Sequence, residues 1–420
     1  MRIKYSFSTL IAVSFIAVSA CSSNDVDPSN HSIRSDGEGI DGSPAANPSD
    51  PAQKDTGASA AASGATLVPS NLPADTCETP ATKDLVIDTW LNTYQCDATI
   101  VQGGGAPDIC VLKGNNVAIH WTSEQTVPLP AFAIVATNQM TVDGTIDFAA
   151  QVRNTSASIV YDDGPGAPDP RGEGPGELGS GAGYGTAGAP DGAGGAGGLA
   201  YGNETGTPLV GGARGGSPWT VDSVIALGGG GGGALQLVAC HQLTITSQGA
   251  INAGGGGGSH GTKVTSGPYS TGAPGGGGGS GGTILLEAAQ MTIAGGLAAN
   301  GGSGGGGGGA FTNWVRIDCD SGWVGAPGGM GTSPASGGAA GNGGIGGGQG
   351  GQGGSATSAP TAGAVGGDCF YGGDGARGGG LGGSGGAVGR IRLNVPAGSA
   401  PNTTGAIISP AASIGTVATH

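Results

Sequence analysis

Glycine supplies 97 of the 420 residues, charged residues make up only 10% and aromatic residues only 4%, and the formal net charge is −15. So little charge excludes an ordinary disordered chain, and so few large apolar side chains exclude a conventional enzyme domain. Collagen is excluded because glycine does not recur at every third residue. A nucleic-acid partner is excluded because binding to phosphates needs an excess of lysine and arginine.

The N-terminus has the parts of an export signal. A basic start, with Arg2 and Lys4, precedes an apolar run over residues 10–17 that is too short to cross a bilayer. The next four residues, Val-Ser-Ala-Cys at 18–21, resemble the lipobox of bacterial lipoproteins. The resemblance implies that residues 1–20 are a lipoprotein signal peptide and that Cys21 carries the lipid, palmitate included. The alternative is an ordinary secretory signal that happens to be followed by a cysteine.

A tether is expected behind the lipid. Residues 21–75 are rich in Ser, Pro, Asp, Ala and Gly and lack apolar periodicity, so they cannot bury enough surface to become ordered. With Ser22 behind the cysteine, the segment resembles lipoproteins that are sorted to the outer membrane of Gram-negative cells. We therefore expect a protein that is held by its lipid at the outer membrane or cell surface.

Three segments in the rest of the chain repeat one pattern. Residues 134–148, 237–251 and 285–297 each contain Gln-[Met/Leu]-Thr-[Val/Ile], then a turn and another aliphatic residue. In the first copy Met140, Val142, Ile146 and Phe148 alternate with polar residues, which is the period of a β-strand. We predict an all-β protein with an N-terminal β cap over residues 76–127 and a repeat body over 128–420.

Two architectures fit these strands. The Asp-Gly pair after Val142 suits a tight hairpin and favours an antiparallel β-sandwich. The constant unit of strand, turn and strand over about 18–20 residues favours a coil of a solenoid, whose apolar stripe is buried only by stacking. The repeats resemble those of haemagglutinin-type β-helical adhesins, with residues 292–301 as the nearest match. That resemblance implies a short right-handed parallel β-helix, which we prefer to the sandwich.

Glycine is concentrated in three inserts between the repeats, at residues 151–233, 254–282 and 301–386. All three follow the same strand of the repeat, so we expect them on one side of the body. Flexible loops are the first expectation, because ordering glycine costs the most backbone entropy. The alternative is an ordered bundle of extended helices with three residues per turn, since several stretches keep a three-residue spacing. The inserts also carry most of the aromatic residues, which we expect mainly to anchor them to the body.

Six cysteines remain after Cys21, and an even number in an exported chain predicts disulfides. They are Cys77, Cys96, Cys110, Cys240, Cys319 and Cys369. We pair Cys319 with Cys369 because they share one insert. Of the possible pairings of the rest, we take Cys77 with Cys96 and Cys110 with Cys240.

No catalytic or cofactor site is predicted. Gly-x-Ser-x-Gly occurs at Ser280, Ser303 and Ser384, but each lies in a glycine string that composition alone produces. We predict no metal site either, although a Cys319–Cys369 disulfide would gather four candidate calcium ligands. These candidates are Asp318, Asp320, Asp368 and Asp374.

The function that follows from these patterns is non-enzymatic. We expect a lipid-anchored surface protein with a structural or adhesive role, whose partners are the membrane and possible cell-surface polysaccharides or proteins. The alternatives are a carbohydrate-binding or carbohydrate-active β-helix, and a ligand-binding module in the Cys319–Cys369 insert.

Overall fold

The computed structural model describes the chain from residue 66 to residue 420. Within this part it leaves out residues 90, 124–129, 155–158, 165–178, 221–222, 225, 267–268, 311–320, 342–345 and 368–378. The chain divides into residues 1–58 and 59–420, and every described residue belongs to the second unit. Cys21, Cys319, Cys369 and the four candidate calcium ligands lie outside the described residues.

The described part of the protein is all-β. Its helical residues are confined to two 3₁₀ turns, η1 (Ala74–Cys77) and η2 (Leu91–Thr93). No helix among the described residues is long and apolar enough to span a membrane.

One large sheet contains 13 of the described strands. Its N-terminal strands are β2 (Leu85–Ile87), β3 (Ala98–Ile100), β4 (Ile109–Gly114), β5 (Val117–Ser123), β6 (Ala131–Ala136) and β7 (Gln139–Asp147). The remaining strands of the sheet are β12 (Ala234–Ile245), β13 (Ala250–Asn252), β16 (Thr283–Ile293), β17 (Gly296–Ala298), β18 (Arg390–Val395), β19 (Ile407–Ser409) and β20 (Ser413–Thr416).

Four small antiparallel pairs accompany this sheet. They are β1 (Leu67–Val68) with β21 (Ala418–Thr419), β8 (Gln151–Asn154) with β9 (Ile159–Asp162), β10 (Trp219–Thr220) with β11 (Ser223–Val224), and β14 (Lys263–Ser266) with β15 (Tyr269–Gly272).

The three sequence repeats lie side by side in parallel and in register. Gln242 of β12 pairs with Gln139 of β7 and with Gln290 of β16, and the following residues continue both pairings. The antiparallel arrangement that we considered for the repeats is therefore not the observed one. Within the large sheet the described antiparallel pair is β3 with β4.

The Asp-Gly pair after Val142 does not form a hairpin. Strand β7 runs through it, and the pairing with β5 shifts register between Ile119 and Trp121. A Cβ atom on Gly144 would lie 1.4 Å from the carbonyl oxygen of His120, so only glycine fits this irregularity. Gly144 therefore allows a β-bulge between parallel strands and does not form a turn.

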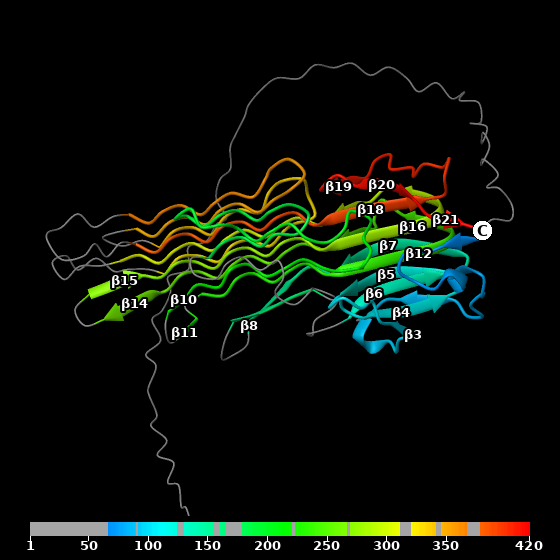
Figure 1. Ribbon diagram of the computed structural model, residues 1–420, viewed down its shortest axis with the longest axis horizontal. Helices are drawn as coiled ribbons and strands as arrows, with labels where there is room; N and C mark the ends of the chain where they lie inside the picture. Colours follow the sequence, from blue (N-terminus) through cyan, green and yellow to red (C-terminus); the bar gives the residue numbers. More distant parts are fainter. Residues whose placement is uncertain are drawn as a thin grey trace, which may run out of the picture. The chain divides into compact units, whose positions relative to one another are not determined.

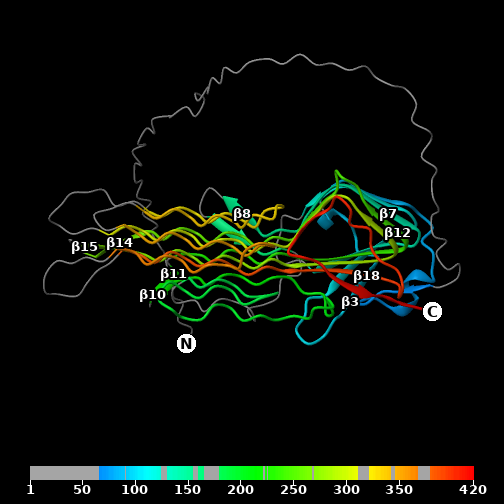
Figure 2. The same cartoon turned by 90° about the horizontal axis from the view of Figure 1, so that it is seen from above.

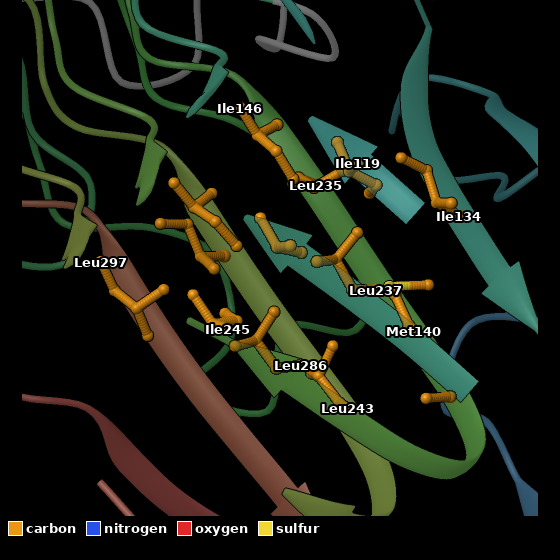
Figure 3. Packing of buried hydrophobic residues seen from close by; sticks show 14 of the residues in the cluster. Ile119, Ile134, Met140, Ile146, Leu235, Leu237, Leu243, Ile245, Leu286 and Leu297 are labelled. Carbon is orange, nitrogen blue, oxygen red and sulfur yellow. The ribbon is translucent and has the colours of Figure 1, made fainter. Parts of the chain in front are cut away.

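Side chains from stacked strands fill the core (Figure 3). Met140, Val142, Ile146 and Phe148 are all at most 1% exposed, which confirms the predicted alternation in this repeat. Aliphatic residues of β5, β12, β16 and β18 extend the same cluster. The opposite face of the sheet holds a second, smaller apolar cluster that includes Leu67, Leu72 and Leu209.

The ordered body begins ahead of residue 76, inside the segment that we expected to be tether. Leu67 and Leu72 are 1% and 8% exposed, and β1 pairs with the C-terminal strand β21. Ser70 binds the fully buried carboxylate of Glu287 on β16 through its backbone N–H (3.0 Å) and its hydroxyl (2.5 Å). Gln236 Nε2 (2.7 Å) and Asn394 Nδ2 (2.9 Å) donate to the same carboxylate. Glu287 of β16 thus connects the start of the body to the neighbouring strands β12 and β18.

Replacement of Glu287 by glutamine is expected to lower the free energy of unfolding by about 3 kcal/mol. The amide keeps one acceptor oxygen but turns an N–H₂ group toward buried donors that then lose their partner. Urea unfolding of the full chain measures the loss. The control is Glu204→Gln at an exposed position, which should leave the midpoint unchanged.

The two described disulfides join Cys77 to Cys240 and Cys96 to Cys110, so the predicted pairing of these four cysteines is wrong. The physical reason is the β3–β4 pair, in which Thr99 lies opposite Cys110 and so brings Cys96 near it. We call the core cluster of Met140 the inner cluster and the smaller cluster on the opposite face the outer cluster. Cys110 belongs to the inner cluster and Cys96 packs against it, whereas Cys77 packs against the outer cluster.

Glycine-rich segments extend from one end of the strands as long, nearly parallel traces (Figures 1 and 2). They enter or leave the sheet at residues 233, 253, 282, 299 and 389, next to β12, β13, β16, β17 and β18. The pairs β10–β11 and β14–β15 lie toward the opposite end of these traces (Figure 1). We refer to the described residues of 179–218, 226–233, 253–262, 273–282, 299–308, 322–367 and 379–389 as the glycine bundle.

Candidate functional site

Backbone hydrogen bonds hold the glycine bundle together. In the central segment, 273–282, three successive residues donate to three different neighbours: Gly278 to Ser384 (2.7 Å), Gly279 to Gly256 (2.9 Å) and Ser280 to Ala213 (3.0 Å). Other segments donate to the same three residues, with Ala182 bound to Gly278, Gly302 to Gly279 and Gly232 to Ser280. The pattern repeats every three residues, which is the period of the polyproline II type of helix.

The central segment therefore has six neighbouring segments, which are 179–184, 209–217, 226–233, 253–261, 299–308 and 379–389. The described inserts are thus ordered, as in the alternative that the three-residue spacing raised. Flexible loops were the wrong expectation for these residues. Backbone hydrogen bonds between segments offset the entropy cost of ordering glycine, because buried N–H and C=O groups find partners in neighbouring segments.

Glycine is placed where segments touch. A Cβ atom on Gly279 would lie 1.9 Å from the carbonyl oxygen of Gly230, and one on Gly278 would lie 2.1 Å from that of Gly302. Real side chains essentially never come so close, so these contacts require glycine. Side chains are consequently left for the outside of the bundle and for a few buried positions.

The three serines of the Gly-x-Ser-x-Gly strings occupy such buried positions. Ser280, Ser303 and Ser384 are 0% exposed. The hydroxyl of Ser384 donates to Pro190 O (2.6 Å) and accepts from Gly363 N (3.0 Å), while that of Ser303 donates to Ser336 O (2.6 Å). These hydroxyls join neighbouring segments, a structural role that the motif by itself did not reveal.

Two tyrosines anchor the bundle at its junction with the sheet, as expected for aromatic residues of the inserts. Tyr184 is 0% exposed, and its hydroxyl donates to Val210 O (3.0 Å) and lies 2.5 Å from Thr283 Oγ1. The ring lies 4.7 Å from that of Tyr201 and 5.6 Å from the guanidinium carbon of Arg390. Burial raises the pKa of Tyr184 to about 12. Burial, with Tyr184 nearby, also raises the pKa of Tyr201.

Stability should therefore fall at alkaline pH. The folded pKa of Tyr184 lies above the ordinary value of 10.0, so its contribution is complete below pH 10 and is lost as pH rises toward 12. The expected loss from this residue is about 2–3 kcal/mol. Urea unfolding between pH 9 and pH 12 measures it. Tyr184→Phe should flatten the fall, and Tyr94→Phe, which changes an exposed hydrogen bond, should not.

The outer surface of the bundle is uncharged and partly apolar over most of its length. The described bundle residues from 226 to 389 include no Asp, Glu, Lys or Arg. Leu199, Trp323 and Val365 are 73%, 70% and 63% exposed. We call these three residues the exposed apolar set; an exposed apolar side chain on a rigid support suits contact with a partner surface.

A second candidate surface, which is polar, lies on the sheet. Gln139, Gln242 and Gln290 pair in register on β7, β12 and β16 and are exposed, and the next row on the same face consists of the half-buried Thr141, Thr244 and Thr292. Nearby, His120 Nδ1 lies 2.6 Å from Asp143 Oδ1. The row that contains Asp147 continues as Asn252 and Ala298, so acids do not repeat along it.

No group of three or more His, Cys, Asp or Glu side chains that could hold a metal ion occurs among the residues that the structure describes. The chain matches no protein-family model, no curated protein and no solved structure.

Proposed function

We propose that this chain is a lipid-anchored protein of the bacterial outer membrane or cell surface with a non-enzymatic, structural or adhesive role. In this proposal the body is a short right-handed parallel β-helix that carries the glycine bundle as a rigid projection. The lipobox-like residues 18–21 support the anchor, and the in-register parallel repeats support the β-helix.

The observation that carries the adhesive role is the exposed apolar set on an ordered bundle that is uncharged over most of its length. A chain with net charge −15 repels other acidic surfaces except where it lacks charge. The described bundle residues from 226 to 389, which include Trp323 and Val365, form such a region, whereas the segment of Leu199 also carries Glu204 and Arg214. Backbone hydrogen bonds hold the bundle in place without a large core. Little ordering entropy is then lost when a partner binds.

Adhesion of cells that export the full chain tests this role. Cells are bound to sibling cells, host cells and immobilised polysaccharides, and the chain with Leu199→Ser, Trp323→Ser and Val365→Ser is compared with the original. We expect at least about tenfold weaker binding of the triple variant. The control is Val86→Ser, which removes a 50% exposed apolar residue from β2. Equal binding by the triple variant and the original would refute an adhesive role for the bundle.

The anchor has a separate test. Cells that express the full chain or its Cys21→Ser variant are grown with labelled palmitate, and the chain is recovered with an antibody. We expect label in the original and none in the variant. Equal labelling of the two would remove the lipid anchor from the proposal.

The glutamine and threonine rows favour a second candidate, a carbohydrate-binding surface on the sheet. Neighbouring strands lie about 4.8 Å apart, so the rows repeat amide and hydroxyl groups at intervals close to the length of one sugar unit. Binding of the full chain to a polysaccharide panel should then weaken in a Gln139→Ala, Gln242→Ala, Gln290→Ala variant. Binding that depends on the exposed apolar set instead would favour the bundle.

A further inference from the structure

The two edges of the large sheet differ in how they are covered. At the N-terminal edge, the short strands β2 and β3, the turn η2 and the Cys96–Cys110 disulfide surround the first strands. At the other edge, β20 pairs with β18 and β19 pairs with β17, and no described strand lies beyond either of them (Figure 1). The backbone on the outer side of β19 and β20 is a free strand edge, which is a template for further pairing.

The apolar core continues to this free edge. Ile134, Leu237, Leu286 and Leu393 occupy matching positions on successive strands and are all 0% exposed. Ile414 of β20 is the next member of the column, opposite Leu393, and it is 55% exposed. Ile407 of β19, which lies opposite Gly296 and outside this column, is 54% exposed at the same edge. The stack of apolar side chains therefore ends in solvent.

The charge pattern points to what covers this edge. Residues 396–417 contain no Asp, Glu, Lys, Arg or His, in a chain of net charge −15. The charged group nearest β20 in β18 is Arg392, on the other face of the strand, where its Nε donates to Asn394 Oδ1 (2.8 Å) and its guanidinium lies against Gly415 of β20. A two-fold contact places identical groups opposite each other at its axis, so two copies of an acidic chain repel each other least where the segment at the axis carries no acidic residue.

We propose that the free edge formed by β19 and β20 binds the same edge of a second copy of this chain. A two-fold axis sets β20 of one copy antiparallel to β20 of its partner, and the Ile414 side chains of the two copies close the two apolar columns against each other. The main chain supplies hydrogen bonds, and the burial of Ile407 and Ile414 supplies the apolar contact. This dimer does not depend on the adhesive role or on the lipid anchor.

Light scattering of the full chain in detergent, over a range of concentrations, tests the proposal. We expect a dimer that dissociates on dilution, and a dissociation constant that rises at least about 100-fold in Ile414→Asp, because two carboxylates then face each other at the two-fold axis. The milder Ile414→Ser should weaken the dimer less. Thermal unfolding of the monomers should remain unchanged, since the side chain is more than half exposed in the single chain.

The matched control is Val86→Asp, at a 50% exposed valine of β2. It adds the same charge away from the edge and should leave the dimer intact. Three results would overturn the proposal: a monomer at every concentration, a dimer that persists in the Ile414→Asp variant, or a dimer that the Val86→Asp variant disrupts equally.

Discussion

Replacing Gly279 by alanine is expected to cost about 3 kcal/mol or more of unfolding free energy, because no space exists for the added methyl group. Its Cβ atom would lie 1.9 Å from Gly230 O and 2.6 Å from the carbon of the same carbonyl. Gly279 belongs to the segment with six neighbours, so a shift away from Gly230 moves it into another segment. Relief requires separation of segments and loss of several backbone hydrogen bonds at once.

Urea unfolding and limited proteolysis of the full chain measure this effect. The variant should unfold at lower urea and be cleaved within residues 226–308. The control is Gly329→Ala, since a Cβ atom at Gly329 meets nothing within 4 Å. That change should be neutral or stabilising by about 0.5 kcal/mol, through the lower entropy of the unfolded chain. If both alanines behave alike, the close-packed bundle is wrong.

Removal of the Cys77–Cys240 disulfide should cost about 5 kcal/mol on the chain-entropy model, because it closes a loop with a sequence separation of 163. It also joins η1 to β12, and so fastens the N-terminal segment to the middle of the sheet. The Cys77→Ala, Cys240→Ala double variant should therefore unfold at much lower urea, or fail to accumulate in folded form. Unfolding curves under non-reducing conditions measure the difference.

The comparison is the Cys96→Ala, Cys110→Ala double variant, whose loop has a sequence separation of 14. The same model gives it a loss of about 3 kcal/mol. The order of the two losses is the informative result. A larger loss of unfolding free energy from the short loop would mean that local packing in the inner cluster, and not loop closure, determines how much these disulfides stabilise the protein.

The sequence determined by itself the features that depend on local order along the chain. The alternation at Met140, Val142, Ile146 and Phe148 predicted a strand with one buried face, and burial follows it. The recurring Gln-[Met/Leu]-Thr unit predicted equivalent strands, which pair residue for residue. These features are readable because side-chain direction in a strand depends only on whether a position is odd or even.

Only the tertiary structure decided which distant segments meet. The pairing of Cys77 with Cys240 follows from the position of η1 on the outer face of the sheet, and the role of Gly144 from the bulge beside His120. The order of the glycine bundle was likewise undecided in the sequence, because an isolated glycine segment has no hydrogen bonds of its own. Its N–H and C=O groups are satisfied only when six neighbours surround it, and those neighbours come from segments as far apart as residues 182 and 384.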